Sequence, residues 1–298
     1  MRILLLGSDG QLGTELRRAT PQGAELHAPS LAEADLTRLD ALQKLIRELR
    51  PAFILNAGGY TAVDRAEAEP GLARAINGEG PAMLADEAAR LGAGMIHYST
   101  DYVYGGNQSR PWTEADAATP CNVYGVTKLA GDLAVLGSRA RAVVLRTSWV
   151  YAAHGNNFVR TMLRLGREQE QLRVVSDQTG CPTWARDLAR VSWTLVERGC
   201  EPGGLFHCAG SGATSWHGFA ERIFTLARTR PAGSGLRVQE VAAIATSDWK
   251  TAAQRPLQSA LDCSRLEREH GMRLPAWQES LAACIDEIGA LTTAGAAR

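Results

Sequence analysis

A tyrosine and a lysine stand four residues apart in the segment Tyr124-Gly-Val-Thr-Lys128. On a helix, residues at this spacing lie on the same face, one turn apart. A phenol with its usual pKa of about 10 exchanges protons poorly at neutral pH, but a nearby ammonium group favours the phenolate. The hydroxyl of Thr100 could hold a carbonyl oxygen beside Tyr124. With a nicotinamide cofactor supplying a hydride, this set of residues could reduce a ketone.

The same spacing occurs by accident on many solvated helices, so its interpretation depends on the elements around it. Five apolar segments are typical of buried parallel strands, at residues 2–6, 24–28, 52–57, 94–99 and 142–147. Helical patterns separate them, including 39–49 and 81–91. This alternation predicts an α/β fold with a Rossmann-type doubly wound parallel sheet. His97, inside the fourth strand, is expected to be a packed strand residue rather than a catalytic base.

A glycine-rich turn connects the first expected strand to the first expected helix. Its sequence is Gly7-Ser-Asp-Gly-Gln-Leu-Gly13, with GxxGxxG rather than GxGxxG spacing. Glycines permit a tight turn and the close approach of a pyrophosphate, while the helix N-terminus supplies N–H groups. Turn glycines alone are a weak signal, but directly after an N-terminal strand they favour nucleotide binding. The expected cofactor contacts here are Gly7, Gly10, Gln11, Leu12 and Gly13.

The ends of the next two strands bear on the choice of cofactor. The second strand ends in His-Ala-Pro-Ser30, without the carboxylate that would bind ribose hydroxyls and favour NADH. No arginine follows to bind a 2′-phosphate, so the choice stays open, with a slight preference for NADPH. Asp35 and Leu36 either contact the adenine or help to start the helix near residue 39, where Asp35 or Thr37 could serve as the cap. After the third strand, small residues leave space for a nucleotide.

The second half of the chain contains no phosphate-binding turn of its own. Helical patterns cover 157–169, 215–229 and 276–289, and a further helix to residue 196 has Thr183 as its expected cap. Short strands are expected at 172–175 and 204–209. We therefore expect a dinucleotide-binding domain at 1–150. Residues 151–298 are expected to form a smaller, mainly helical substrate-binding lobe, partly interleaved, with some segments returning to the sheet. The tail from Leu291 is expected to fray.

Composition excludes several classes of function. The 298 residues include 32 basic and 32 acidic side chains, so no overall charge attracts nucleic acid or a membrane surface. The apolar N-terminal segment is too short for a signal peptide or a membrane span. Six cysteines lie far apart without a CxxC pair, which argues against zinc and disulfides. These features predict a cytoplasmic protein with free thiols and no partner in nucleic acid or membrane.

Taken together, these motifs resemble the extended short-chain dehydrogenase/reductases and, more closely, the dTDP-4-dehydrorhamnose reductase family. The similar segments span nearly the whole chain in order: 7–13, 60–64, 99–104, 124–128, 146–151, 157–158 and 177–183. The resemblance implies reduction of the C4 ketone of a dTDP-linked 6-deoxy sugar by NADPH or NADH. It implies as catalytic residues Thr100, Tyr124 and Lys128. Around the cofactor it implies Gly10, Gln11, Leu12, Asp35, Leu36, Ala57 and Gly58; our expected contacts also include Gly7, Gly13, Ser30, Tyr60, Tyr124 and Lys128. At the sugar it implies Thr61, Val63, Thr100, Asp101, Tyr102, Tyr124 and Trp149.

One position distinguishes reduction from dehydration within this superfamily. The related sugar-nucleotide dehydratases carry an Asp-Glu pair after the catalytic threonine, because eliminating water needs acid–base groups that a simple reduction does not. Here Asp101 is followed by Tyr102. A dehydratase is therefore disfavoured. Two alternatives remain: a ketoreductase for another dTDP-4-keto-6-deoxy sugar, and a non-catalytic homologue like the regulatory subunit of methionine adenosyltransferase.

The chain also departs from the usual pattern of the family. Gly58 and Gly59 stand where relatives usually have alanines, and Asp132 replaces the usual glutamate after Lys128. Some relatives dimerise through a magnesium ion held by acidic residues. Glu15 matches one such position, but Arg186 stands where another carboxylate would fall. A magnesium-bridged dimer is therefore doubtful, no metal ligand is assigned, and Glu15 is expected to be a surface helix residue. The chain is expected to be a monomer or a homodimer.

Overall fold

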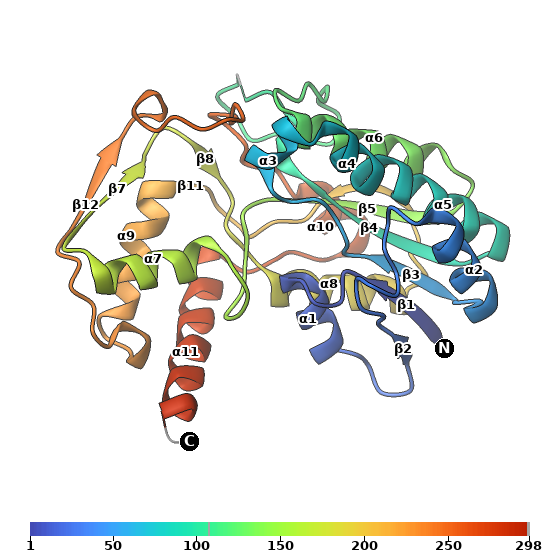
Figure 1. The fold of residues 1–298 in the computed structure, drawn as a ribbon, viewed down its shortest axis with the longest axis horizontal. Helices are drawn as coiled ribbons and strands as arrows, with labels where there is room; N and C mark the ends of the chain where they lie inside the picture. Colours follow the sequence, from blue (N-terminus) through green and yellow to red (C-terminus); the bar gives the residue numbers. More distant parts are fainter. Residues whose placement is uncertain (107, 297–298) are drawn as a thin grey trace.

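A computed structural model describes residues 1–106 and 108–296. Its central element is a six-stranded parallel sheet with the order β10-β5-β4-β3-β1-β2 (Figure 1). The strands are β1 (Arg2–Leu6), β2 (Glu25–His27), β3 (Phe53–Asn56), β4 (Gly94–Thr100), β5 (Arg141–Thr147) and β10 (Gly204–His207). The predicted α/β fold with a Rossmann-type doubly wound sheet is confirmed.

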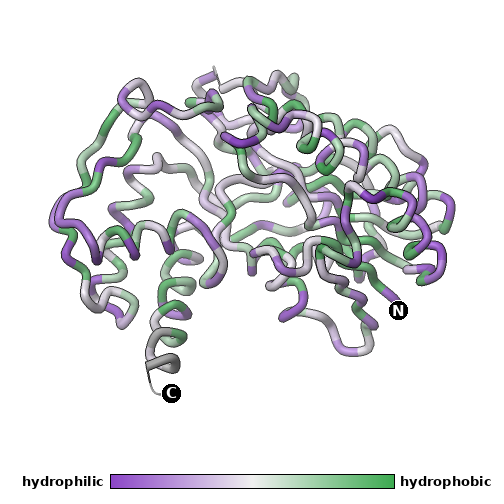
Figure 2. The backbone as a smooth tube through the Cα atoms, viewed as in Figure 1, coloured by the Kyte–Doolittle hydropathy of each residue, from purple (hydrophilic) through white to green (hydrophobic). Residues whose placement is uncertain are grey.

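Helices cover both faces of this sheet because successive strand residues point to opposite sides. In β1, Ile3 and Leu5 join one core with α1 (Gln11–Arg18) and α8 (Ala185–Glu197). Leu4 and Leu6 join the other core with α2 (Leu39–Leu49), α5 (Gly80–Leu91) and α6 (Val123–Gly137). All four side chains are at most 1% exposed. The sheet is therefore buried on both sides. Figure 2 colours the backbone by hydropathy, with hydrophobic residues in green.

The strand order places the nucleotide-binding elements together. β1 pairs with β2 on one side and with β3 on the other, so the direction of connection reverses between β1 and β3. Parallel sheets bind ligands outside the C-terminal ends of their strands at such a switch point. After β3, the chain forms α3 (Val63–Ala68), α4 (Pro70–Arg74), a π-helical segment (Ala75–Glu79) and α5.

A second group of elements packs around its own core, which includes Tyr151, Phe219 and Trp277. Its helices are α7 (Phe158–Glu168), α9 (Trp216–Ala227) and α11 (Trp277–Ala296). Its strands form three pairs: β6 (Val150–Tyr151) with β9 (Thr183–Trp184), β7 (Gln171–Val175) with β12 (Glu240–Ile244), and β8 (Thr179–Gly180) with β11 (Thr214–Ser215). Between them the chain returns to the large sheet with α8, β10 and α10 (Ser264–His270). Figure 1 shows the two groups side by side.

Several local expectations are wrong. Thr183 does not cap α8, because its hydroxyl donates to the Cys181 carbonyl and accepts from the Gly210 amide. Asp35 does not cap α2 either: it accepts hydrogen bonds from the amide and hydroxyl of Thr37 in a turn before the helix. The C-terminal helix continues to Ala296 instead of fraying from 291, and residues 297–298 lie outside the described part.

The expectation that His97 is a packed strand residue is confirmed. His97 is fully buried in β4. All six cysteines lie in the described part of the chain and are free thiols. Within the described ranges, no helix is both long and apolar enough to cross a membrane.

Candidate active site

The glycine turn after β1 leaves backbone where side chains would otherwise stand. Gly7 has a φ of +73°, and the Gly10 amide donates to the Gly7 carbonyl at 3.1 Å. A Cβ on Gly7 would lie 2.5 Å from the Gly58 nitrogen, and one on Gly13 would lie 2.1 Å from the Gly7 oxygen. The turn is thus packed directly against the end of β3 and the start of α1. Gly10 precedes the first residue of α1, so the N–H groups of Gln11 and Leu12 belong to the free helix end that suits a pyrophosphate.

The expected adenosine-side residues surround the same turn. Leu36 is 5% exposed, and its Cδ1 lies 2.9 Å from where a Cβ on Gly58 would be, so Ala57, Gly58 and Leu36 form one wall beside Gly7. At the end of β2, the amide and hydroxyl of Ser30 both donate to Glu33 Oε2 at 2.8 Å. A carboxylate therefore lies beside Ser30, the residue near which space for a 2′-phosphate was expected. Asp35 is partly exposed next to this wall.

The expected catalytic residues come from two elements, β4 and α6. Thr100 ends β4, and its Oγ1 accepts a hydrogen bond from the Tyr102 amide at 3.1 Å. Tyr124 is in the first turn of α6, which Asn122 caps by accepting from the Gly125 amide at 2.8 Å. The rings of Tyr102 and Tyr124 meet edge to face, with centroids 5.8 Å apart. The geometry brings Thr100, Tyr102 and Tyr124 to one place at the C-terminal end of the sheet.

Tyr124 and Lys128 share a helix face, but no hydrogen bond joins their side chains in the described part of the chain. Burial raises the pKa of Tyr124 to about 12; a hydrogen bond with Thr100 lowers it, and the charges of Asp101 and Asp132 raise it. Lys128 Nζ donates instead to the Tyr98 carbonyl oxygen at 2.6 Å. At neutral pH the phenol therefore keeps its proton, which is the form that an acid needs.

Lys128 is the buried cation of the site, with 4% of its surface exposed. Burial lowers its pKa to about 8, whereas the charge of Asp132 raises it. Its charge at neutral pH therefore depends on the acidic group one helical turn further along α6.

Asp101 is a buried carboxyl next to Thr100. Its Oδ1 accepts from the Thr100 hydroxyl and its Oδ2 accepts from the Ser148 hydroxyl, both at 3.0 Å. Burial raises its pKa to about 6, and hydrogen bonds from Ser259, Ser148 and Thr100 oppose this rise. The carboxyl thus fixes the orientation of Thr100, and it is 2% exposed, which leaves little of it available to a sugar.

The remaining expected sugar contacts lie on segments that border this place. Thr61 is exposed and Val63 begins α3. The Tyr60 hydroxyl donates to Glu69 Oε2 at 2.6 Å, so this side chain points along α3. Trp149 has a φ of +46° and stacks on Trp216, with ring centroids 3.5 Å apart and planes 7° from parallel.

Sequence reasoning missed four contributors to this site. Arg255 reaches across from the second group of elements, forms two hydrogen bonds with Asp64 at 3.1 and 2.7 Å, and also hydrogen bonds to Tyr102. Ser148 and Ser259 bind Asp101. The apolar helix pattern around Trp216 did not indicate that its ring stacks on Trp149. Nothing in the local sequence connects positions so far apart, although Ser148 adjoins Trp149 in a segment already singled out.

The expectation that Glu15 is a surface residue is wrong, because α8 and α11 cover it. Its side chain is 1% exposed. Its Oε1 lies 2.9 Å from Arg18 Nη1 and 2.8 Å from His154 Nε2, and its Oε2 accepts from Arg186 Nε at 2.9 Å. Glu287 uses both of its oxygens in the same way, with Arg18 at 3.1 Å and Arg186 at 2.7 Å.

These residues do not fit the magnesium site that some relatives share between subunits. Magnesium needs free carboxylate oxygens at about 2.0–2.1 Å in octahedral geometry. Here a guanidinium group binds every oxygen of both carboxylates. In the part of the chain that the structure describes, no group of three or more His, Cys, Asp or Glu side chains is arranged to hold a metal ion. No step of the chemistry below involves a metal.

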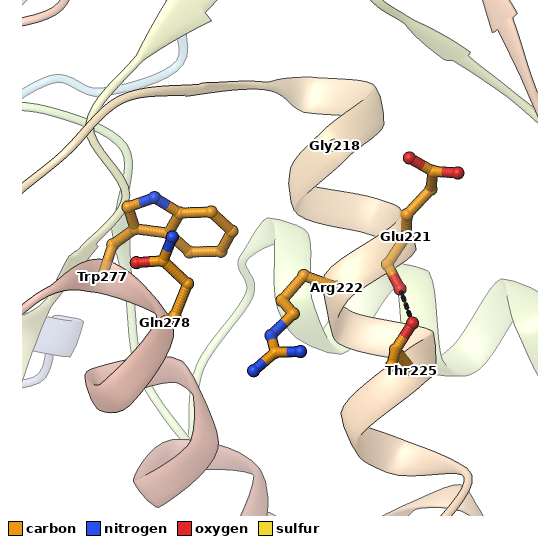
Figure 3. Close-up of a pocket in the computed structure, with 6 residues that line it drawn as sticks. All are labelled: Gly218, Glu221, Arg222, Thr225, Trp277 and Gln278. Carbon is orange, nitrogen blue, oxygen red and sulfur yellow. Dashed lines mark hydrogen bonds between the residues drawn. The ribbon is translucent and has the colours of Figure 1, made fainter.

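A separate hollow lies on the second group of elements, between α9 and α11 (Figure 3). Arg222 extends from α9 into this gap, and the Thr225 hydroxyl donates to the Glu221 carbonyl at 2.8 Å. The hollow is lined by Gly218, Glu221, Arg222, Thr225, Trp277 and Gln278. None of the expected cofactor, catalytic or sugar residues lines this hollow.

The fold and the convergent residues define a class of protein. The sheet is parallel and has a glycine turn after its first strand. A threonine ends β4, and a tyrosine and a lysine lie one turn apart on α6. This is the construction of an extended short-chain dehydrogenase/reductase. The family model described as RmlD substrate binding domain matches residues 1–290. The chain belongs to this family, that of the dTDP-4-dehydrorhamnose reductases.

Individual relatives are similar to this chain over nearly its full length. The chain is 39% identical over 295 residues to the dTDP-4-dehydrorhamnose reductase of Burkholderia thailandensis, covering 97% of this chain and 99% of that protein. The crystal structure of the Bacillus anthracis reductase in complex with NADP has a TM-score of 0.90 at 33% identity, over 96% of this chain and 99% of that one. A Clostridium acetobutylicum structure has a TM-score of 0.90 at 37% identity, over 97% and 99%.

Proposed function

We propose that this chain reduces the C4 ketone of dTDP-4-dehydro-L-rhamnose to dTDP-L-rhamnose, with NADPH or NADH as the reductant. The observation that carries the proposal is the meeting of Thr100 and Tyr124 at the C-terminal end of the sheet, with buried Lys128 one turn further along α6. A dehydratase would need a second acidic residue after Asp101, and Tyr102 occupies that position with its ring against Tyr124. Full-length similarity to named reductases supports the same reaction.

The chain's own residues account for the proton side of the reaction. A nicotinamide cofactor supplies the hydride that reaches the ketone carbon. Tyr124 gives its phenolic proton to the ketone oxygen, which becomes the new hydroxyl group. Lys128 reduces the cost of the phenolate that remains, because its ammonium charge is buried on the same helix face. The Thr100 hydroxyl donates its single proton to Asp101, so it would have to turn that proton from Asp101 to the ketone oxygen when the substrate lies beside Tyr124.

The cofactor residues follow from the same arrangement. The pyrophosphate would lie against the N–H groups of Gln11 and Leu12, in the space that Gly7, Gly10 and Gly13 leave open. Ala57, Gly58 and Leu36 would line the adenosine and nicotinamide side, with Tyr60 at its border, and Ser30 and Asp35 would face the ribose and adenine. Lys128 would also bind the nicotinamide ribose.

The sugar nucleotide would lie between the two halves of the chain. Residues 1–150 would bind the dinucleotide and most of 151–298 would bind substrate. The sugar would be bordered by Thr61, Val63, Thr100, Asp101, Tyr102, Tyr124 and Trp149. We place the reaction in the cytoplasm, in a monomer or homodimer that does not need a metal bridge.

The test compares turnover by the protein with and without the phenolic hydroxyl group of Tyr124. Purified protein is mixed with NADPH and dTDP-4-dehydro-L-rhamnose, and NADPH consumption is followed for wild type and Tyr124→Phe. We expect the variant to lose about 10²–10⁴ in kcat, the usual contribution of a general acid. No turnover by wild type, or an unimpaired variant, refutes the proposal. Product NMR separates the alternative sugar: coupling constants other than those of rhamnose would reassign the substrate.

A further inference from the structure

A buried ion pair lies under the catalytic helix, and the proposed reduction does not use it. Asp132 on α6 is fully buried, and Arg146 on β5 is 4% exposed. Arg146 Nε donates to Asp132 Oδ2 at 3.0 Å. Buried ion pairs seldom stabilise a fold more than apolar residues of the same volume would. The position of this pair next to Lys128 therefore calls for another explanation.

The helix places Asp132 where it can act on the catalytic lysine. Tyr124, Lys128 and Asp132 follow one another at intervals of four residues, so they lie along one face of α6. Lys128 Nζ donates to a neutral acceptor, the Tyr98 carbonyl. Among the described residues, Asp132 is the acidic group whose charge favours the ammonium form of Lys128.

Histidine does not compete for this role. His97 Nε2 lies 3.8 Å from Asp132 Oδ1, but the Asn56 amide donates to His97 Nδ1 at 3.1 Å. Burial and the charge of Lys128 hold the pKa of His97 well below its usual value, so the ring is neutral. Asp132 thus has a neutral imidazole and two cations, Lys128 and Arg146, as neighbours. Burial raises the pKa of Asp132, and the charges of both cations oppose this rise.

Arg146 is fixed independently of Asp132. Its Nη1 donates to the Tyr104 hydroxyl at 2.7 Å, and that hydroxyl contacts His207 Nε2 at 2.7 Å. Burial is the largest cause that lowers the pKa of His207 to about 4, so it too is neutral. In the described part of the chain, the charged and titratable groups that act on Lys128 or on Asp132 are these two residues themselves, His97 from β4 and Arg146 from β5, with Tyr124 one turn before Lys128 on α6.

We propose that Asp132, anchored by Arg146, is a positioning residue of the reductase site: its carboxylate is the counter-ion that keeps the buried Lys128 ammonium charged and in place beside Tyr124. The inference rests on the function proposed above. Without the carboxylate, two cations would share one buried face, and the one that can release a proton is Lys128. A neutral Lys128 would no longer stabilise the phenolate left after proton transfer.

The pH dependence of kcat/KM provides the first test. The pKa of Tyr124 is about 12 and that of Lys128 is about 8, so Lys128 sets the alkaline limit of activity. Removing the carboxylate in Asp132→Asn lowers the pKa of Lys128 further, and the alkaline limit should move down by roughly one pH unit. Asp132→Glu keeps the charge, so its limit should stay near that of wild type.

A matched control separates this effect from lost stability. Glu87 on α5 is also a buried carboxylate, bound by Arg47 and Arg90, but it lies away from the catalytic helix face. Glu87→Gln should lower the melting temperature and leave the alkaline limit unchanged. An unchanged limit in Asp132→Asn, or an equal shift in Glu87→Gln, overturns the proposal.

NMR provides a direct reading of the same group. Lysine occurs only at positions 44, 128 and 250, so protein labelled on the lysine side chains gives a simple spectrum. In wild type the Lys128 signal should titrate near pH 8, and in Asp132→Asn at a clearly lower pH. If wild type itself lacks turnover, the reductase proposal fails, whereas an unshifted Lys128 signal in an active protein refutes only the role of Asp132. If neither Asp132→Asn nor Asp132→Ser folds, the carboxylate is a requirement of the fold and the proposal is overturned.

Discussion

Gly180 supports the tryptophan expected at the sugar, and a single methyl group there should displace it. A Cβ on Gly180 would lie 2.4 Å from Trp149 Cε2 and 2.6 Å from its Nε1, whereas ordinary contact begins at 3.4 Å. The indole must therefore move by about 1 Å. The ring cannot simply slide, because it is stacked on Trp216 with centroids 3.5 Å apart. Overpacking of this kind costs about 1–3 kcal/mol.

The expected result of Gly180→Ala is a selective loss of substrate binding. If Trp149 contacts the sugar, a displacement of about 1 Å should raise KM for the sugar nucleotide roughly tenfold, equivalent to about 1.4 kcal/mol. The dissociation constant for NADPH should not change, because the glycine turn is on the other half of the chain. The free energy of unfolding should fall by about 1–3 kcal/mol. Steady-state kinetics, cofactor titration and urea denaturation measure the three quantities.

Gly71→Ala is the matched control. No atom lies within 4 Å of where its Cβ would be, and the residue is in α4. This variant should keep its kinetics and gain up to about 1 kcal/mol of stability. A destabilised Gly180→Ala protein with an unchanged KM would show that Trp149 does not contact the sugar. A Gly180→Ala protein as stable as wild type would contradict the packing itself.

Two further predictions concern the charged groups that differ from expectation. Because Arg186 binds both Glu15 and Glu287, magnesium should not change the melting temperature of wild type. Arg186→Glu should be less stable without magnesium and should regain stability when the ion is added. Thermal scans with EDTA or magnesium measure both effects, and a wild type stabilised by magnesium would contradict the prediction. The Glu33 carboxylate binds Ser30, on the side proposed for the 2′-phosphate, so Glu33→Gln should tighten NADPH binding roughly two- to fivefold relative to NADH. Fluorescence titration at low salt measures the two dissociation constants. An unchanged ratio of these constants would place the 2′-phosphate elsewhere.

The features predicted correctly from the sequence depend on local patterns. Buried parallel strands are continuously apolar, and the glycine turn directly follows one of them, so the sequence predicted the doubly wound sheet and the place of this turn in it. The spacing of Tyr124 and Lys128 fixed their common helix face. Strand β12 was missed because only Ile244 among its five residues is buried, which leaves no clear apolar pattern.

What the sequence did not reveal depends on contacts between distant segments. Arg255 meets Asp64 across 191 positions of the chain. Glu15 looks like a solvated helix residue until α8 and α11 cover it. Likewise, Thr183 was a reasonable helix cap, but its hydroxyl is used by the Gly210 amide. Burial of a polar group is decided by its partners, and a spacing rule does not identify them.

The late return of β10 to the large sheet has a consequence for how the protein is made. A ribosome synthesises the chain from its N-terminus, so β5 is complete once Thr147 has been added. Its outer neighbour in the sheet, β10, is complete only at His207. The helix α8, which covers one face of the sheet, is also synthesised only by residue 197. Until then the nascent chain carries an open sheet edge with apolar surface beside it, which is prone to pair with other strands. We therefore expect nascent chains stalled before residue 185 to depend on chaperones, and chains that have released β10 to be free of that dependence.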